Sequence, residues 1–375
     1  MPLQVGEPAP WFICPTAARA RFGLDTVAGR FIVLSFLGSV EDPDGARFLA
    51  RIHGSRARFD DGDLSFFGVS TDPDDERMGR AVDSIPGIRY FRDYQQAVSR
   101  QYGVVGAEGH YRRITYVLDP ALRVLATLPF DSDADVHASE LFEVLDRLPA
   151  IPPARPAAPQ APVLVLPRIF EAELCAALVE HYRAHGGEES GFMRDIDGTT
   201  RTVFDYGHKR RRDCIVLDRD LQQACTSRIR RRLVPEVYKA FQFRATRLER
   251  CIVACYDAAE GGHFRPHRDN TTKGTAHRRF AVSLFLNTGE YEGGFLRFPE
   301  YGPALYAAPR GGAIVFSCSL LHEATPVTRG RRFMFLPFLY DEAGRQIRED
   351  NLRFIDTASL DAVPGEARPE ARESH

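Results

Sequence analysis

A proline-rich stretch divides this chain and limits how it can fold. Residues 149–164 read PAIPPARPAAPQAPVL, with six prolines and no glycine. Such a segment offers few backbone amides to a helix or sheet and behaves as a semi-rigid extended spacer. We therefore expect two separately folded domains, at 1–148 and 163–345, joined by a linker over 149–162. We expect residues 346–375 to form a C-terminal extension with a disordered tail.

Composition excludes several classes of protein. The 49 Lys and Arg residues nearly balance the 51 Asp and Glu residues, which argues against a dedicated nucleic-acid binder. No apolar run approaches the roughly 20 residues that a membrane span needs. The N-terminal residues MPLQVGEPAPWFICP lack a basic region followed by an apolar core, so we expect no secretory signal and a cytoplasmic location. The seven cysteines lack close CxxC spacing and fit reduced thiols better than a disulfide framework.

Short apolar runs alternate with helical patterns in the first domain. Strands are expected over residues 30–37, 64–69, 114–118 and 124–128. Helical stretches are expected over residues 46–52, 77–83 and 135–148. Alternation of this kind predicts an α/β domain.

Four segments of this domain, VGEPAPWF, RFIVLSFLGS, FFGVSTD and RRITYVLDPALRV, resemble the peroxiredoxin branch of the thioredoxin-like fold. The resemblance covers nearly all of residues 1–148 and implies an α/β thioredoxin-like fold. Peroxiredoxins carry a Pro-x-x-x-Thr-x-x-Cys loop after the strand that corresponds to 30–37. Here that region reads GSVEDPDGARF, without cysteine or threonine. Because peroxide reduction needs a thiolate nucleophile, we expect no peroxidase activity.

One further position of this domain corresponds to a residue of the peroxiredoxin active site. Arg112 or Arg113 occupies the place of the family's active-site arginine, without a role that it could inherit. Cys14 is the one thiol before Cys175, and we interpret it as a small buried side chain. A domain without a catalytic thiol is expected to serve in binding, whether of substrate, of a second subunit or of the C-terminal half. A homodimer is thus one arrangement that the sequence leaves open.

The expected secondary structure of the second domain changes from helices to strands along the chain. Helical spacing covers residues 170–184 and 217–241. From about residue 246 the pattern is one of strands, in LERCIVACY, RRFAVSLFLN, GGFLRF, GGAIVFS and RRFMFLPFLY. Many short strands after helices predict a β-sandwich or barrel with a helical layer on one side.

The segment HFRPHRDN places His267 two residues before Asp269. Side chains two residues apart in an extended segment project to the same face, so an imidazole and a carboxylate can bind one ion there. His322, in LLHEATPV, is the third candidate ligand. Two histidines and one carboxylate leave coordination positions open, as in non-haem Fe(II) oxygenases. His263 and His277 lack a carboxylate two residues on, and we interpret them as loop or rim residues.

Arg332 follows His322 by ten residues, in VTRGRRFMF. An arginine inside a β-barrel needs an anionic partner, because a buried unpaired guanidinium is costly. A dicarboxylate would supply one through a bidentate pair. Tyr256 could add a hydrogen bond to the same carboxylate. Arg329 and Arg331 are alternative anchors, and two of these three arginines are expected to be exposed.

The segments IVACYDAAEGGHFRPHRDN, RRFAVSLFLN, YEGGFLRFPEYG and GGAIVFSCSLLHEATPVTRGRRF together closely resemble the prolyl-4-hydroxylase-like branch of the Fe(II)/2-oxoglutarate-dependent dioxygenases. The resemblance covers about residues 247–342 and implies a double-stranded β-helix (jelly roll) with a supporting helical layer. It implies Fe(II) as the metal, with 2-oxoglutarate and O2 as cosubstrates. The implied iron ligands are His267, Asp269 and His322, and the implied 2-oxoglutarate contacts are Arg332 and Tyr256.

The resemblance also bears on the reaction. Related halogenases lack the carboxylate ligand, so Asp269 favours hydroxylation of a C–H bond. Arg278 opens RRFAVSLFLN, where related prolyl hydroxylases can carry a basic residue that faces the substrate; exposure at the strand end is the alternative. The predicted substrate is a peptidyl or free amino acid. A non-peptide small molecule is the second hypothesis, and a redoxin-like adaptor with a vestigial metal site is the third, which the complete ligand set disfavours.

Two basic runs bear on the choice of partner. They are residues 208–212, which read HKRRR, and the set Arg228, Arg230, Arg231 and Arg232. Because no aromatic residues interleave with them for base stacking, we interpret them as solvated surface, mostly one helix face. We therefore expect a small-molecule or peptide substrate, with no nucleic acid and no membrane.

Overall fold

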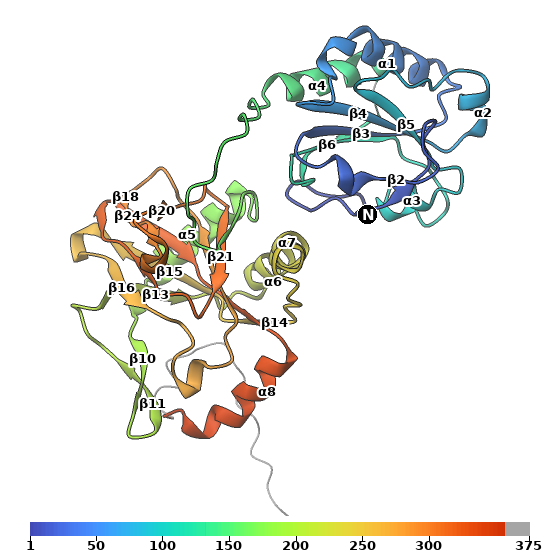
Figure 1. Cartoon of the computed structure of the whole chain (residues 1–375). Coiled ribbons are helices and arrows are strands. Elements are labelled where there is room, and N and C mark those ends of the chain that lie inside the picture. Colours follow the sequence, from blue (N-terminus) through green and yellow to red (C-terminus); the bar gives the residue numbers. More distant parts are fainter. Residues whose placement is uncertain (132, 357–375) are drawn as a thin grey trace, which may run out of the picture. The chain divides into compact units, whose positions relative to one another are not determined.

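The structure, a computed structural model, describes residues 1–131 and 133–356. The chain divides into two compact units, one ending at Arg155 and one beginning at Pro156 (Figure 1). The division falls within the proline-rich stretch, and residues 149–161 form neither helix nor strand. The tail that the sequence predicts to be disordered, residues 361–375, lies outside the described residues.

The helices and strands of the N-terminal unit alternate along the chain. They are β1 (Ile13–Cys14), β2 (Phe22–Gly23), β3 (Phe31–Gly38), α1 (Pro43–Gly54), β4 (Leu64–Ser70), α2 (Pro73–Arg77), β5 (Ile88–Arg92), α3 (Ala97–Gln101), β6 (Ile114–Leu118), β7 (Val124–Pro129) and α4 (Ala134–Asp146).

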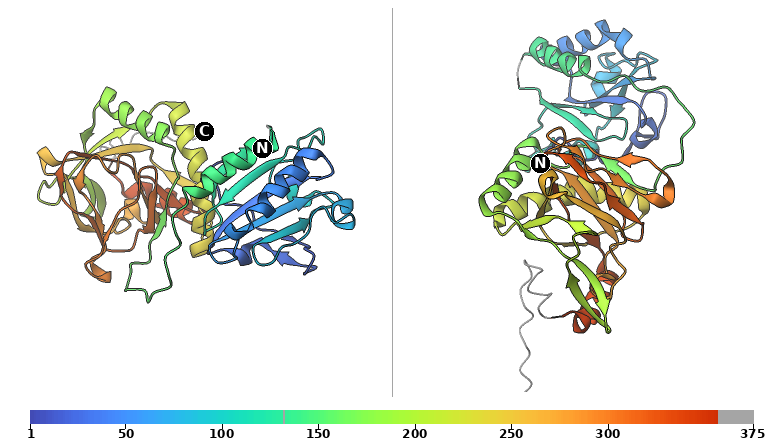
Figure 2. Two further views of the ribbon diagram at one scale, coloured as in Figure 1. Left: turned by 90° about the horizontal axis from the view of Figure 1, so that it is seen from above. Right: turned by 90° about the vertical axis from the view of Figure 1, so that its left-hand side faces the viewer.

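A five-stranded sheet of order β5-β4-β3-β6-β7 forms the centre of this unit. The pairs β3–β4 and β4–β5 are parallel, whereas β3–β6 and β6–β7 are antiparallel. Helices α1 and α4 pack side by side on one face, as Figure 2 shows from two further directions. Residues of α3 and β1 pack on the other face. Because both faces are covered, every residue of β3 is buried. The predicted thioredoxin-like α/β fold is confirmed.

One predicted helix of this unit is wrong. Of residues 77–83 only Arg77 is helical, as the last residue of α2, the helix of this region. Asp72 caps α2 by accepting a hydrogen bond from the Asp74 amide, and Pro73 has the fixed φ that suits a first helical turn. Gly79 adopts a left-handed conformation with φ +65°, so the chain turns where the apolar spacing had predicted a continuing helix.

The C-terminal unit is richer in strands. Its elements are β8 (Leu164–Leu166), α5 (Ala172–His185), β9 (Glu188–Glu189), β10 (Phe192–Ile196), β11 (Thr199–Val203), β12 (Lys209–Arg210), β13 (Arg212–Ile215), α6 (Arg219–Arg228), α7 (Val234–Phe241), β14 (Arg247–Glu249), β15 (Ile252–Asp257), β16 (His263–His267), β17 (Phe280–Phe285), β18 (Glu292–Gly293), β19 (Leu296–Arg297), β20 (Leu305–Tyr306), β21 (Ala313–Ser317), β22 (His322–Ala324), β23 (Val327–Arg329), β24 (Arg331–Phe335), β25 (Phe338–Tyr340) and α8 (Glu342–Asn351).

Two main sheets and two two-stranded sheets, β10-β11 and β18-β23, make up the described part of this unit. The larger main sheet has the order β14-β25-β17-β24-β15-β13-β9, and in it β21 also pairs with β17 and β8 pairs with β21. The smaller has the order β12-β16-β22-β19-β20. This arrangement confirms the predicted jelly roll. The strands β9 to β13 were not predicted. Helix α8 crosses the predicted domain boundary at 345, and the chain beyond it pairs Ile355 with Thr200 of β11.

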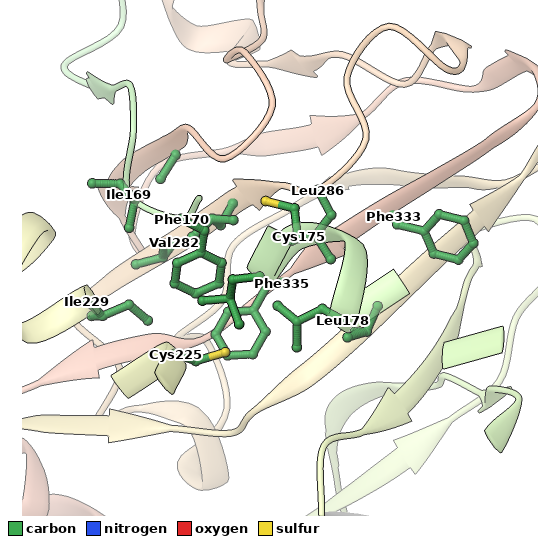
Figure 3. Packing of buried hydrophobic residues seen from close by; sticks show 14 of the residues in the cluster. Ile169, Phe170, Cys175, Leu178, Cys225, Ile229, Val282, Leu286, Phe333 and Phe335 are labelled. Atoms are coloured by element: carbon green, nitrogen blue, oxygen red, sulfur yellow. The ribbon is translucent and has the colours of Figure 1, made fainter. Parts of the chain in front are cut away.

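Alternation along the strands of the larger sheet separates two apolar clusters. Phe333 and Phe335 of β24 pack against α5 and α6, beside Cys175, Leu178 and Cys225 (Figure 3). Met334 belongs instead to the cluster that includes Phe264 and Leu296 of the smaller sheet. Because successive side chains of a strand point to opposite faces, Arg332 lies on the same face as Met334. The strand thus directs Arg332 into the interior of the jelly roll.

The helices of the described residues, in both units, do not combine the length and apolar character that crossing a membrane requires.

Candidate active site

The two candidate histidine ligands lie on neighbouring strands of the smaller sheet. Antiparallel pairing of β16 with β22 sets His267 directly opposite His322. Asp269 follows in the turn after β16, where its amide donates to the Cys318 carbonyl at 3.0 Å. Its carboxylate oxygens lie 3.6 Å from His267 Nε2 and 3.4 Å from His322 Nε2. The three ligand atoms lie within 4.8 Å of one another, a geometry that one metal ion can bridge.

Hydrogen bonds orient both imidazole rings. His267 Nδ1 donates to the Arg265 carbonyl at 2.7 Å, and His322 Nδ1 donates to the Leu320 carbonyl at 3.0 Å. With Nδ1 protonated in this way, the neutral ring presents the lone pair of Nε2 to a metal. Burial and the neighbouring His267 lower the pKa of His322 to about 4, so this ring is neutral at neutral pH.

The Asp269 carboxylate is ionised. Burial alone would raise its pKa, but His322, His267 and Arg278 hold the pKa of Asp269 well below its usual range. Two neutral imidazole nitrogens and one carboxylate are a donor set suited to a divalent transition metal. These residues therefore fit an iron ion on the chemistry of their donors.

Arg332 and Tyr256 lie opposite each other on β24 and β15. Arg332 is 1% exposed, and its Nε has no hydrogen-bond partner. Its guanidinium carbon lies 5.0 Å from the centre of the Tyr256 ring and 5.3 Å from that of Phe285. Within residues 1–131 and 133–356, no carboxylate pairs with Arg332. A buried guanidinium without a countercharge is unfavourable, so an anionic ligand is needed to neutralise Arg332. Arg329 and Arg331 are exposed and pair with Glu292 and Asp257, as predicted for two of the three arginines.

One cavity of about 500 Å³ joins these groups. Its walls include the three candidate metal ligands together with Arg332 and Tyr256. A metal centre and an anion site thus open into the same space, large enough for a small bound molecule.

Residues 251–340 match the sequence profile of the 2OG-Fe(II) oxygenase superfamily. This range contains the His267-x-Asp269 pair, His322 and Arg332, which the structure brings to one cavity. The C-terminal unit carries a 2OG-Fe(II) oxygenase domain. Residues 5–127 match the AhpC/TSA family, so the chain fuses this oxygenase domain to an N-terminal peroxiredoxin-like domain.

Curated relatives of the oxygenase domain are hydroxylases. A PKHD-type hydroxylase of Synechococcus sp. (strain JA-2-3B'a(2-13)) is 33% identical over 88 residues, which are 22% of this chain and 38% of that protein. A PKHD-type hydroxylase of Bordetella pertussis is 34% identical over 112 residues, 27% of this chain and 46% of that protein. The chain spans less than half the length of these relatives.

Solved structures resemble each unit separately. A prolyl hydroxylase in complex with a hypoxia inducible factor peptide fragment, from Trichoplax adhaerens, is 15% identical with a TM-score of 0.41, over 50% of this chain and 87% of that one. The peroxidoxin BcpB of Mycobacterium tuberculosis is 22% identical with a TM-score of 0.34, over 40% of this chain and 99% of that one.

His263 and His277 are not part of the candidate metal cluster. His277 lies in the loop before β17, as predicted for a loop residue, whereas His263 lies on a strand. His263 is buried on β16, with Nδ1 2.8 Å from the Gly261 carbonyl oxygen. His277 is 2% exposed, and its Nε2 lies 2.8 Å from Glu249 Oε2. Each ring is held by a partner of its own, because buried imidazole nitrogens need hydrogen bonds.

Arg278 lines the cavity and is not exposed at a strand end. It donates to both oxygens of Glu249, from Nε at 2.9 Å and from Nη2 at 2.6 Å. Its guanidinium carbon also lies 4.1 Å from the centre of the Phe338 ring. Arg278 thus lines the candidate active-site cavity, although its charge is already paired with Glu249.

The prediction that both basic runs are solvated surface holds only in part: Arg210, Arg212 and Arg230 are exposed, but other members of each run are buried. In the first run, Lys209 and Arg211 are buried. Lys209 Nζ donates to Ser190 Oγ at 2.7 Å and to the Gly191 carbonyl at 2.6 Å. Arg211 Nη2 donates to Asp213 Oδ2 at 2.5 Å and to Ser190 Oγ at 3.1 Å. Burial becomes favourable here because both cations have partners.

In the second run, the helix face is covered by an acidic partner. Arg232 is 3% exposed, and its Nη2 donates to Glu171 Oε1 at 2.6 Å. Arg228 Nε donates to the other oxygen of Glu171 at 3.3 Å. These arginines connect the end of α6, and the π-helical segment Ile229–Leu233 that follows it, to the N-cap of α5.

Sequence reasoning missed part of the cavity wall. Residues 209, 211, 213 and 215 all line it, alternating with residues that do not. This period of two, with Asp213 as a countercharge after two cations, was the available signal of a strand. Arg250 also lines the cavity, and nothing in its local sequence pointed to that position.

In the peroxiredoxin-like domain an ion pair lies at the start of α1, the helix that follows β3. Asp42 caps α1, and Arg113 Nη1 donates to both of its oxygens at 3.1 Å. Cys14 lies elsewhere and is 3% exposed. Burial, together with the charge of Asp93, raises the pKa of Cys14 to about 12, so this thiol is protonated at physiological pH. An inert thiol agrees with the interpretation of Cys14 as a buried apolar side chain.

Proposed function

We propose that this protein is an Fe(II)- and 2-oxoglutarate-dependent dioxygenase that hydroxylates a C–H bond of its substrate. The main support is that one cavity contains both a His-Asp-His cluster and a buried arginine. This arginine has no carboxylate partner among the described residues. Neither feature alone would specify the reaction. Together they provide one site for a metal and one for the distal carboxylate of a dicarboxylic acid.

The residues have distinct roles in this proposal. His267 and His322 hold Fe(II) through Nε2, and Asp269 holds it through its carboxylate. Arg332 binds the 5-carboxylate of 2-oxoglutarate, and the Tyr256 ring, packed against the guanidinium, shapes that end of the site. Bound iron supplies the activation of O2 that couples oxidation of 2-oxoglutarate to succinate and CO2 with hydroxylation of the substrate. One oxygen atom enters succinate and the other enters the new hydroxyl group.

The protein surroundings support this chemistry. The apolar side chains Phe264, Leu296 and Phe316 line the cavity and limit the water that reaches the metal. His267 stacks on Phe264 with ring centres 3.5 Å apart, which restrains the orientation of this ligand. A rigid ligand set keeps the metal aligned with the anion site.

The substrate is proposed to be a peptidyl or free amino acid, with a non-peptide small molecule as the alternative. A redoxin-like adaptor with a vestigial metal site is disfavoured, because all three ligands are in place with their hydrogen bonds. A homodimer and a cytoplasmic location remain proposals, as do the domain limits 1–148 and 163–345.

The direct test is turnover. Purified full-length protein with Fe(II), ascorbate and 2-oxoglutarate is incubated with a panel of free amino acids and peptides. Succinate formation is measured together with mass spectrometry for a product heavier by one oxygen atom. The proposal fails if the protein binds neither metal nor 2-oxoglutarate and forms no succinate under any of these conditions.

A further inference from the structure

Seven Lys and Arg side chains line the cavity of the oxygenase domain. Arg194 is exposed to solvent, and Arg268 pairs with Glu300. The other five are Lys209, Arg211, Arg250, Arg278 and Arg332. Three of them have partners within the chain. Arg278 is paired with Glu249, Arg211 with Asp213, and Lys209 with Ser190 and the Gly191 carbonyl. The proposed function assigns Arg332 to 2-oxoglutarate. Arg250 is left without a function.

Arg250 stands between β14 and β15 in a left-handed backbone conformation, with φ +63°. Its Nε is buried and has no hydrogen-bond partner. The guanidinium carbon lies 4.6 Å from the centre of the Phe338 ring, and no carboxylate pairs with it in the described part of the chain. Burial, reinforced by the like charge of Arg278, lowers the pKa of Arg250 to about 10. The side chain is therefore still a cation at neutral pH, in a place that disfavours its charge.

The acidic residues nearby are committed to other cations. Both oxygens of Glu249 accept hydrogen bonds from Arg278, and Oε2 is also 2.8 Å from His277 Nε2. Oδ2 of Asp213 accepts from Arg211 and, at 2.6 Å, from Ser190. Oδ1 of Asp213 has no hydrogen-bond partner, and the carboxylate is shared by three cations, acting more strongly with Arg211 and Lys209 than with Arg250. Both carboxylates favour the charge of Arg250 at a distance, but among the described residues neither forms an ion pair or a hydrogen bond with it.

The cosubstrates do not supply the missing anion either. In the proposed function the three positive charges of Fe(II) and Arg332 balance the three negative charges of Asp269 and the two carboxylates of 2-oxoglutarate. The cavity with both bound thus still contains a guanidinium that lacks an anion. A forked guanidinium suits bidentate pairing with a carboxylate.

We propose that Arg250 binds a carboxylate of the substrate, so that this enzyme acts on a carboxylate-bearing compound. The inference rests on the proposed function and names the substrate class for the same site. The α-carboxylate of a free amino acid and the side-chain carboxylate of an acidic peptide share the required chemistry. The Arg250–carboxylate pair would fix which C–H bond of the substrate faces the metal.

The test compares acids with their neutral amides. Full-length protein is loaded with Mn(II), which replaces iron without turnover, and with 2-oxoglutarate. Calorimetric titrations then compare free amino acids with the corresponding amino-acid amides, and aspartyl and glutamyl peptides with their asparaginyl and glutaminyl counterparts. In at least one of the two arms, we expect the acid to bind at least about tenfold more tightly than its amide.

Three variants assign this preference to a residue. Arg250→Gln should reduce the ratio of acid to amide affinity to about one, and Arg250→Lys should retain part of it because the charge remains without the fork. Arg244→Gln removes an exposed arginine of the same domain that does not line the cavity, and should leave the ratio unchanged. Unchanged affinities of Arg250→Gln for Mn(II) and 2-oxoglutarate establish that this variant is folded.

Each outcome bears on the inference. Preference in the amino-acid arm alone identifies a free carboxylic acid as the source, and preference in the peptide arm alone identifies an acidic peptide. Equal binding of acids and amides by the unmodified protein overturns the inference, as does a preference that survives in Arg250→Gln. Loss of 2-oxoglutarate binding in Arg250→Gln would also overturn it, because Arg250 would then hold the cosubstrate. An unmodified protein that binds neither Mn(II) nor 2-oxoglutarate would instead defeat the proposed function and the inference together.

Discussion

Gly294 lies directly against Arg332, with room for a hydrogen atom but not for a methyl group. A Cβ atom on Gly294 would be 2.6 Å from Arg332 Cδ and 2.9 Å from Val327 Cγ2. Gly294 also has φ +63°, a backbone conformation that favours glycine. The turn after Glu292 therefore leaves space for the long arginine side chain to extend into the jelly roll.

Gly294→Ala should weaken 2-oxoglutarate binding by at least about tenfold while metal affinity changes little, because the new methyl group displaces Arg332 from its anion site. Calorimetry with Mn(II)-loaded protein measures both affinities. Gly289→Ala is the matched control: Gly289 has φ +98°, with no atom within 4 Å of an added Cβ, so it reports backbone strain alone. Equal effects of the two substitutions would show that Gly294 does not position Arg332.

Substitution of Arg332 tests the anion site itself. Arg332→Ala should weaken 2-oxoglutarate by about 100-fold, and Arg332→Lys by less, because lysine keeps the charge but loses the bidentate fork. The apparent affinity for 2-oxoglutarate is the measurement. Arg331→Ala is the control, since Arg331 is exposed and pairs with Asp257. An unchanged affinity in Arg332→Ala would move the role to Arg331 or Arg329.

Removal of one histidine ligand should abolish stoichiometric metal binding. We expect His267→Ala and His322→Ala to bind Fe(II) at least about 100-fold more weakly, since two ligands remain where three are needed. Metal analysis after gel filtration and Mn(II) titration measure this. His185→Ala, an exposed histidine at the end of α5, should keep one metal per chain. Full metal content in both ligand variants would refute the assignment.

The peroxiredoxin-like domain should show no thiol-dependent turnover of peroxide. Cys14 is the only cysteine of this domain, and its pKa of about 12 leaves almost no thiolate at pH 7. Peroxide consumption with a dithiol reductant should equal the background rate in both the unmodified protein and Cys14→Ser. Sustained turnover that disappears in Cys14→Ser would contradict this expectation.

The stability of the peroxiredoxin-like domain should fall as the pH drops from 6.5 toward 4. His137 is fully buried, and its Nε2 lies 2.9 Å from Thr115 Oγ1. Burial lowers its pKa from 6.5 to about 4 in the folded state. Below pH 6.5 the unfolded chain therefore binds a proton that the folded chain does not, which costs roughly 3 kcal/mol at most. Above pH 6.5 this contribution to stability is complete.

Urea unfolding followed by the fluorescence of Trp11, the single tryptophan of the chain, measures this dependence. His137→Gln should flatten the decline between pH 6.5 and 4.5. His110→Gln changes an exposed histidine of the same domain and should keep the slope of the unmodified protein. A slope that is identical in all three proteins would exclude His137 as its source.

Much of the architecture could be predicted from local patterns. The prolines at 149–162 separate the two units because proline cannot complete the backbone hydrogen bonds of a helix or sheet. Arg332 could be singled out because it follows His322 by ten residues at the start of an apolar strand, where a buried arginine needs an anionic partner. The spacing of His267, Asp269 and His322 predicted a metal cluster, and the pairing of β16 with β22 then brought the two histidines side by side.

Only the tertiary structure decided which other charges are buried. Lys209 and Arg211 read as solvated surface because their partner Ser190 lies on a segment that the sequence did not predict as part of the sheet. Arg278 pairs with Glu249, which lies 29 residues earlier in the sequence. Both oxygens of Glu249 accept hydrogen bonds from Arg278, so the adjacent Arg250 does not pair with them. Local periodicity determines which face of an element is apolar. The burial of a charge depends instead on countercharges brought from distant segments, so it is determined by how the strands pair and not by the residues beside it.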